Sequence, residues 1–236
     1  MKIENVGNCI INRYLLPTGD GYCLVDTGNV WEFKEFRKKM RKHNIPLSKI
    51  KYVALTHIHA DHVGFLKELL EETGATLIYD MSTRKRLEAG KNDLNTYISG
   101  FILLIISKIS AFFVDKTQTF PAVFTDKCID VSTQPLSIYG IEFITLKGHT
   151  TSDTCIKYGD KLLCGDLFMS GISSYKHMPS WVRNKFDIID SWKKVQAMTG
   201  INFILPSHGR AFEKKKIKNC IEYWQQKGVF KLFADN

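Results

Sequence analysis

The sequence has no CxxC pair, and its six cysteines stand singly along 236 residues. This spacing excludes a cysteine-based zinc motif and the disulfide framework of a small secreted protein. We therefore expect reduced, mostly buried thiols and a cytoplasmic location. The N-terminus lacks a charged leader followed by an apolar core, so no secretory signal is expected. A hydrophobic content of 44% excludes a disordered chain.

Long apolar runs and internal repeats are also scarce. The longest run, residues 97–114, contains Gly100 and Lys108 and falls short of the roughly 20 apolar residues of a membrane-spanning helix. No transmembrane segment is therefore expected. The run lies within residues 81–120, which interrupt the rhythm of strands and helices and are interpreted as a helical insertion. It can pack on the domain or form a homodimer, cover a substrate pocket as a lid, or contact a membrane surface.

Acidic residues are outnumbered, with 24 acidic against 33 basic side chains and a net charge of +9. Such an excess can indicate nucleic acid binding, or a solvated surface rich in lysine. The basic residues fall mainly in "KEFRKKMRKHN" and "EKKKIKN", which have the character of exposed helix faces. Neither run interleaves aromatic residues as a groove for single strands does. Nucleic acid is therefore not the expected partner.

Strand patterns occur in both halves of the chain, with helices between and after them. Residues 9–28 predict two strands joined by a "TGDG" turn, and residues 154–168 predict a hairpin that turns at "YGDK". Helical spacing is found over residues 30–43, 63–74, 187–198 and 212–227. The pattern suits an α/β fold in which sheets lie between helices, and residues 1–236 are interpreted as a single domain.

Histidine is rare, yet three of the seven histidines lie within "THIHADHVG". They can be polar surface residues, core residues or metal ligands. His57 and His59 stand two positions apart at the end of a strand, so their side chains point the same way. Asp61 and His62 fall where the next helix begins, and the turn can bring them back to the same point. Such a density of nitrogen and oxygen donors favours a divalent metal.

Three later segments supply donors in the same structural context. His149, Asp166 and His208 each follow an apolar strand, in "KGHTTSD", "LLCGDLF" and "LPSHGR". Each lies beside a glycine, which permits a tight backbone turn at the strand end. One such histidine alone is more often structural, but the shared placement favours a common site.

The ordered motifs "THIHADH", "GHT", "GDL" and "SHG" resemble the metallo-β-lactamase superfamily, whose pattern is HxHxDH followed by His, Asp and His. "LVDTG" is similar to the Asp-Thr-Gly turn of that family. The likeness covers most of the chain outside residues 81–120. It implies a four-layer αββα sandwich with a two-metal centre at one edge, most similar to the glyoxalase II-like and lactonase-like branch.

The resemblance also implies a role for each donor. It assigns His57, His59 and His149 to a first metal, Asp61, His62 and His208 to a second, and Asp166 to a bridge between them. Two divalent ions, zinc or else iron or manganese, then activate a hydroxide for hydrolysis. Asp61 and Asp166 are the expected catalytic carboxylates, since Asp61 can also take a proton or orient the hydroxide. Asp26 is expected to support the ligands from behind.

The expected substrate is a small ester, thioester or lactone. A bridging Asp166 differs from the true β-lactamases, and Met169 stands where lactonase-like members commonly have tyrosine. Residues 171–186 follow Asp166 and either pack on the next helix or contribute substrate contacts, listed here as Tyr175, His177, Trp181 and Arg183. Two alternatives remain: a phosphodiesterase or nucleic-acid-processing enzyme, and a non-catalytic metal-binding sensor.

Overall fold

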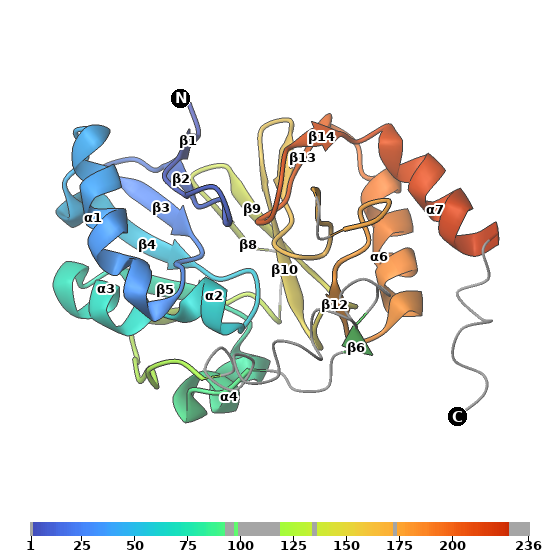
Figure 1. Ribbon diagram of the computed structural model, residues 1–236. Coiled ribbons are helices and arrows are strands. Elements are labelled where there is room, and N and C mark those ends of the chain that lie inside the picture. The colour runs from blue at the N-terminus through green and yellow to red at the C-terminus, as the bar shows by residue number, and fades with distance from the viewer. Residues whose placement is uncertain (1, 93–96, 99–118, 134–135, 172–173, 227–236) are drawn as a thin grey trace.

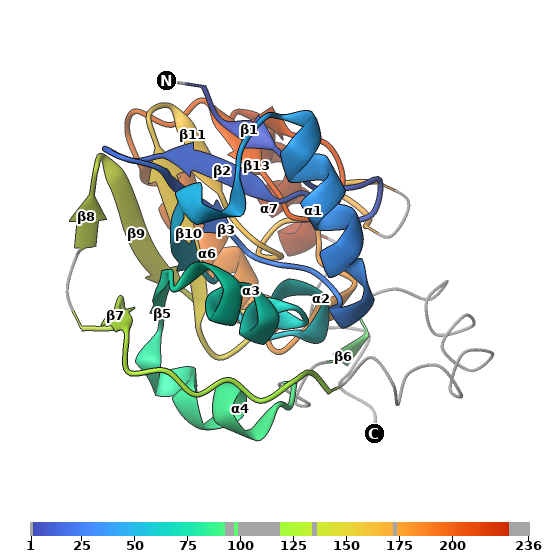
Figure 2. The same cartoon turned by 90° about the vertical axis from the view of Figure 1, so that its left-hand side faces the viewer.

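Two β-sheets face each other and are covered on their outer sides by helices (Figure 1). The computed structural model describes residues 2–92, 97–98, 119–133, 136–171 and 174–226. In Figure 1 the N-terminal sheet and its helices form the left half of the molecule, and the C-terminal sheet with the C-terminal helices forms the right half. Turned by 90°, the molecule presents its N-terminal half to the viewer, with the helices of that half in front (Figure 2). The expected αββα sandwich is confirmed.

The first sheet combines antiparallel and parallel pairs in the order β1-β2-β3-β4-β5-β7. Its strands are β1 (Glu4–Asn5), β2 (Tyr14–Pro17), β3 (Tyr22–Val25), β4 (Ile50–Ala54), β5 (Thr76–Tyr79) and β7 (Cys128–Asp130). The β2–β3 pair is the hairpin predicted for residues 9–28. The β3, β4, β5 and β7 strands run parallel, so the carboxyl ends of β3 and β4 meet at one edge of the sheet.

The second sheet has the order β14-β13-β11-β10-β9-β8. Its strands are β8 (Leu136–Ile138), β9 (Ile141–Leu146), β10 (Asp153–Tyr158), β11 (Lys161–Leu163), β13 (Phe203–Leu205) and β14 (Phe212–Glu213). The β10–β11 pair is the predicted hairpin. The parallel pairing of β11 with β13 brings the segments after both strands side by side.

Alternating side chains along the strands build three apolar layers. Leu15 packs under the helices of the first half, whereas Leu16 points between the sheets. On the second sheet, Leu162 faces the C-terminal helices and Leu163 faces the first sheet. Successive strand residues point to opposite faces of a sheet, and both faces are buried here because helices cover each outer side.

The helices are short and amphipathic. They are α1 (Phe33–Lys42), α2 (Ala60–Val63), α3 (Leu66–Thr73), α4 (Arg84–Ala89), α6 (Lys185–Ala197) and α7 (Lys216–Gln226), with 3₁₀ turns at Val30–Glu32, Leu47–Lys49 and Met81–Thr83. The helix predicted over residues 30–43 therefore begins as a 3₁₀ turn, because Glu32 folds back to accept a hydrogen bond from the Asn29 backbone N–H. Gly74 ends α3 in the left-handed conformation, for which glycine carries no steric cost.

Residues 81–120 interrupt the first sheet between β5 and β7. Their described part contains α4 and the strand β6 (Tyr97–Ile98), which pairs with β12 (Trp181–Val182). The two ends of the segment meet where Lys91 bridges to Thr119. Most of the 97–114 run lies outside the described residues. Packing of this run on the domain, a homodimer, a lid and a membrane contact therefore stay predictions. Among the described residues, no helix combines the length and apolar character needed to cross a bilayer.

Candidate metal centre

The seven candidate ligands converge at one edge of the sandwich. Their donor atoms form three groups, each with atoms within 4.8 Å of one another. The groups are His57, His59 and His149; His57, His62 and Asp166; and Asp61, His62 and His208. The segment after β4 carries His57, His59, Asp61 and His62. The segments after β9, β11 and β13 carry His149, Asp166 and His208, respectively. All seven predicted positions are thus brought together.

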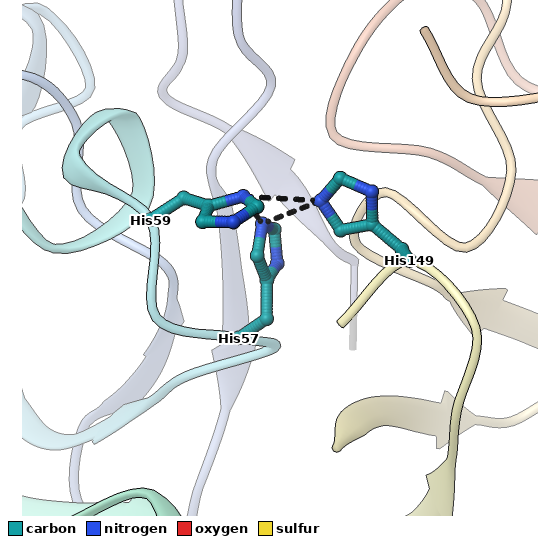
Figure 3. A group of neighbouring side chains, drawn as sticks. All are labelled: His57, His59 and His149. Atoms are coloured by element: carbon teal, nitrogen blue, oxygen red, sulfur yellow. Dashed lines mark hydrogen bonds between the residues drawn. The ribbon is translucent and has the colours of Figure 1, made fainter. Parts of the chain in front are cut away.

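Three imidazole nitrogens of the first group face one another (Figure 3). His57 Nε2 lies 3.0 Å from His59 Nδ1 and 3.2 Å from His149 Nε2, and the remaining pair is 3.1 Å apart. A tetrahedral zinc ion with Zn–N bonds of about 2.0–2.1 Å separates its ligand atoms by roughly 3.3 Å. The three nitrogens therefore stand close to the spacing of three corners of such a tetrahedron.

The outward ring nitrogens show which nitrogens carry protons. His149 Nδ1 lies 2.7 Å from the carbonyl oxygen of Trp181, so it carries a proton and donates it. The Thr56 hydroxyl donates to Asp26 and therefore accepts from His57 Nδ1 at 3.0 Å. Both rings, when neutral, thus present an unprotonated Nε2. Their lone pairs face each other without a proton between them, which is the arrangement that a cation would stabilise.

The lowered pKa values of His57 and His59 keep these two rings neutral. Burial, together with the neighbouring imidazoles, lowers the pKa of His57 well below its ordinary value. Burial and the nearby ring of His149 lower the pKa of His59 to about 3. A neutral imidazole is the form that binds a metal, so both rings are ready to act as ligands at neutral pH.

The second group combines histidines with carboxylates. His208 Nε2 lies 3.2 Å from Asp61 Oδ2 and 3.5 Å from Asp166 Oδ2. His62 Nε2 lies 3.6 Å and 3.7 Å from the same two oxygens. Asp166 Oδ2 is also 3.8 Å from His149 Nε2 of the first group. Asp166 therefore stands between the two halves of the site.

Charge in this second group has the opposite pattern. Burial alone would lower the pKa of His62 and His208. The carboxylates of Asp61 and Asp166 outweigh burial, so the pKa of His62 is raised well above its ordinary value and that of His208 is raised to about 9. In turn, the histidines outweigh burial and hold the pKa of both carboxyl groups below the ordinary value. Protons here provide the positive charge that a divalent cation would otherwise bring.

Two buried atoms of the site lack any hydrogen-bond partner, namely His62 Nε2 and Asp166 Oδ1. An unpaired buried polar atom carries a free-energy penalty. Both atoms belong to groups whose donors fit a cation, so a bound metal would satisfy them. The donor set therefore fits the metal that the sequence predicts.

Asp26 lies behind the site and is fully buried. Its carboxylate accepts hydrogen bonds from the backbone N–H and hydroxyl of Thr56, at 2.8 and 2.7 Å, and from His62 Nδ1 at 2.9 Å. Its backbone has a φ of 57°, a left-handed conformation that aspartate tolerates better than most residues. Asp26 is not one of the converging donors but reaches His62 directly and His57 through Thr56.

The predicted substrate contacts have different surroundings. Tyr175 packs edge-on against Tyr223 of α7, and His177 stacks on Phe212 with ring centroids 3.8 Å apart. Neither belongs to the converging groups of donors. Trp181 and Arg183 lie next to His149, but through their backbones: Trp181 offers its carbonyl, and the Arg183 N–H donates to the carbonyls of Gly148 and His149.

Several supporting groups were not predicted. The carbonyl of Ile10 accepts from His208 Nδ1 at 2.9 Å, and Asn92 Oδ1 accepts from the Ala60 N–H that begins α2. Main-chain carbonyls carry no signature in a sequence, so Ile10 and Trp181 could not be recognised. Thr56 did have a signal, because a hydroxyl directly before a ligand histidine can reach its ring.

The site matches a known family. The model of the metallo-β-lactamase superfamily matches residues 6–176, well over half of the sequence. The chain belongs to the metallo-β-lactamase superfamily. Members of this superfamily are typically metal-dependent hydrolases. Six of the seven donors of the centre fall within the matched range, and His208 lies beyond it.

Similar proteins agree with the superfamily assignment. Lactamase-like protein aptB of Emericella nidulans is 35% identical over 88 residues, which cover 35% of this chain and 26% of that protein. The match thus spans about a quarter of the curated relative. A Cronobacter sakazakii metallo-β-lactamase with a HARLDQ motif has a TM-score of 0.67 and 18% identity, with 95% of this chain and 89% of that chain covered. BJP-1, a subclass B3 enzyme of Bradyrhizobium japonicum, has a TM-score of 0.66, 19% identity, and coverage of 95% and 88%. At these identities, the structural likeness shows the fold alone.

Gly165 provides a test of how closely the site is packed. It has a φ of +54°, and a Cβ there would lie 2.5 Å from Thr56 Oγ1, the hydroxyl that supports His57. Gly159, at the tip of the same hairpin, has a φ of +59° but open space around it. We expect Gly159→Ala to cost about 1–2 kcal/mol for the left-handed backbone alone. Gly165→Ala should cost more and also weaken metal binding. Urea denaturation and metal titration of both variants would measure this, and equal values for the two would contradict it.

Proposed function

We propose that this protein is a hydrolase that uses two divalent cations, most simply zinc, to cleave a small ester, thioester or lactone. The observation that carries the proposal is the sharing of residues between donor groups. His57 and His62 each belong to two of the three groups, so the groups form one continuous centre rather than separate sites. The nitrogen and oxygen donors also accept iron or manganese.

The proposed ligand sets follow from these shared groups. The first cation is assigned to His57, His59 and His149, the second to Asp61, His62 and His208, and Asp166 to both. In support of this role, Asp166 Oδ2 lies 3.5 Å from His208 Nε2 and 3.8 Å from His149 Nε2. A carboxylate with two oxygens and four lone pairs can serve two cations at once.

When bound, a pair of divalent cations supplies a nucleophile at neutral pH and polarises the acyl oxygen of the substrate. The protein places an open carboxylate beside that chemistry. The Asp61 side chain is 39% exposed, whereas those of His62 and Asp166 are 0% and 7% exposed. Since its pKa is held low by the adjacent histidines, which outweigh burial, Asp61 is ionised. We assign it the task of taking a proton from the attacking water or orienting it.

We assign Asp26 a positioning role. Through one carboxylate it supports a histidine from each ligand set: His62 by direct contact and His57 through the hydroxyl of Thr56. These bonds keep Nδ1 protonated on both rings and leave Nε2 for the cation. Such partners of a ligand histidine fix its tautomer and orientation.

A substrate panel tests the proposed reaction class. The zinc-loaded protein should hydrolyse short acyl esters, thioesters or lactones, with kcat/KM changing less than about threefold between 50 and 200 mM salt. This is expected because neutral acyl substrates release no counterions on binding. The measurement is initial rates on matched acyl and nucleotide substrates across this salt range.

The net charge of +9 favours a second candidate, a phosphodiesterase or nucleic-acid-processing enzyme. It predicts turnover of nucleotide polymers that falls steeply, by a power law, as salt is raised. Cleavage of such polymers without cleavage of acyl substrates would replace our proposal. Stoichiometric metal without turnover on either panel would favour the third possibility, a metal-binding sensor.

A further inference from the structure

A separate cavity lies between the segment after Asp166 and the helix α7. Its volume is about 440 Å³. The lining residues are Ser170, Gly171, Ser174, Lys176, His177, Lys216, Asn219 and Cys220. None of the seven candidate ligands of the metal centre is among them.

The described lining of this cavity is rich in donors and contains no carboxylate. It offers two ammonium groups, two hydroxyls and a side-chain amide. Among the described residues, Lys216 forms no ion pair, although α7 carries lysines that do, such as Lys218 with Glu222. Within the described part of the chain, Lys176 forms no ion pair, and its Nζ lies 5.6 Å from the centre of the Tyr223 ring. A carboxylate that interacts with Lys216 is that of Glu213, which pairs with Lys215 and does not line the cavity. Among the described residues, positive charge is therefore concentrated in this lining without a paired carboxylate.

Burial and the positive charge of the two lysines both lower the pKa of the histidine in the cavity. Burial lowers the pKa of His177, and Lys216 and Lys176 lower it further. Its Nδ1 lies 3.0 Å from the carbonyl oxygen of Met169 and donates to it. The ring is thus neutral, and Nε2 remains able to accept a hydrogen bond from a bound group.

The wall that carries Lys176 and His177 is held in an unusual conformation. Both residues have a left-handed backbone, with φ of 49° and 63°, in a tight turn closed by a hydrogen bond from the Met178 N–H to the carbonyl of Tyr175. Glycine or asparagine is the usual choice for such a turn. Stacking of His177 on Phe212 and a bond from Trp224 Nε1 to the Lys176 carbonyl keep the turn in place.

We propose that this cavity binds the phosphate group of a small phosphorylated ligand. Phosphate offers several acceptor oxygens and a double charge, which suit two ammonium groups and adjacent hydroxyl and amide donors. A hydrogen phosphate can also donate to His177 Nε2. The cavity has the size of a small-molecule site rather than that of a lone ion. The proposal does not depend on the reaction carried out at the metal centre.

Calorimetric titration of the metal-loaded protein tests this site, with inorganic phosphate and glycerol phosphate as probes. The informative variant is Lys216→Met, and the matched control is Lys218→Met, which removes the same charge from an exposed side chain of the same helix. We expect saturable binding in the wild-type protein. Binding should be about tenfold weaker in Lys216→Met, which is the loss of one charge-assisted hydrogen bond, and unchanged in Lys218→Met. The tighter of the two probes identifies whether the source is free phosphate or an ester.

The variant His62→Ala separates this site from the metal centre. Phosphate binding that survives His62→Ala but weakens in Lys216→Met supports the proposal. Binding that is lost in His62→Ala and kept in Lys216→Met places the phosphate on the metals and overturns it. Equal weakening in both lysine variants, or no saturable binding up to about 20 mM probe, also overturns it, since even a few bonds to a small ion give millimolar affinity.

Discussion

Replacement of His62 by alanine is expected to remove at least one of the two cations and to reduce kcat/KM by more than about 100-fold. Loss of a residue that only supports a ligand typically costs 10–100-fold in metal affinity or activity, and His62 is proposed as a ligand itself. It also takes part in two of the three donor groups. Elemental analysis of the purified variant, together with initial rates, would measure both effects.

The control for this experiment is His43→Ala. His43 lies at the end of α1 and contacts Glu4 rather than the metal centre. The His43→Ala substitution removes an imidazole that is not a candidate ligand. The metal content and the rate of this variant should therefore match those of the wild-type protein. A His62→Ala protein that is folded by circular dichroism and still carries two equivalents of metal would refute the assignment.

The second large effect is expected for Asp26→Asn. Asparagine tolerates the left-handed backbone at this position, so the fold should persist. However, the carboxylate accepts from the Thr56 N–H with one oxygen and from the Thr56 hydroxyl and His62 Nδ1 with the other. An amide has a single acceptor oxygen, so it cannot accept all three of these bonds. Metal affinity should therefore fall by about 10–100-fold, as measured by competition with a chromophoric chelator.

Substitutions of two residues that bind Asp26 separate the contributions of its hydrogen bonds to metal affinity. Thr56→Val removes the hydroxyl that links Asp26 to His57 but leaves the direct bond to His62, so one cation should be held more weakly than the other. Ser207→Ala removes only the longest bond to Asp26, at 3.3 Å, and should have little effect. Unchanged affinity for both cations in Asp26→Asn would show that the carboxylate has only a structural role.

Much of the fold could be predicted because local patterns and packing agree. Leu15 and Leu16, or Leu162 and Leu163, alternate between two buried layers, and such strands read as continuous apolar runs. Gly74 marks the end of α3 because only a left-handed residue fits there. By contrast, the start of α1 depends on Glu32, whose partner Arg13 lies far away in the sequence. No local pattern contains that pair.

The site was predictable at the level of ligand positions and less so around them. The ligands either follow a strand or, like Asp61 and His62, begin the helix after one. This placement, together with the resemblance of the motifs to the metallo-β-lactamase superfamily, predicted all seven positions. The supports are different, since Ile10 and Trp181 contribute main-chain carbonyls. Tyr175 and His177 follow Asp166 closely in sequence, yet the turn they form packs them against α7 and β14.

Elemental analysis of the purified wild-type protein, joined to melting curves with and without chelator, tests the two-cation centre most directly. We expect close to two equivalents of a divalent metal per chain and a lower melting temperature once the chelator removes them, because a cation that binds only the folded state stabilises it. A protein that carries no stoichiometric metal and melts at the same temperature in chelator would contradict the account.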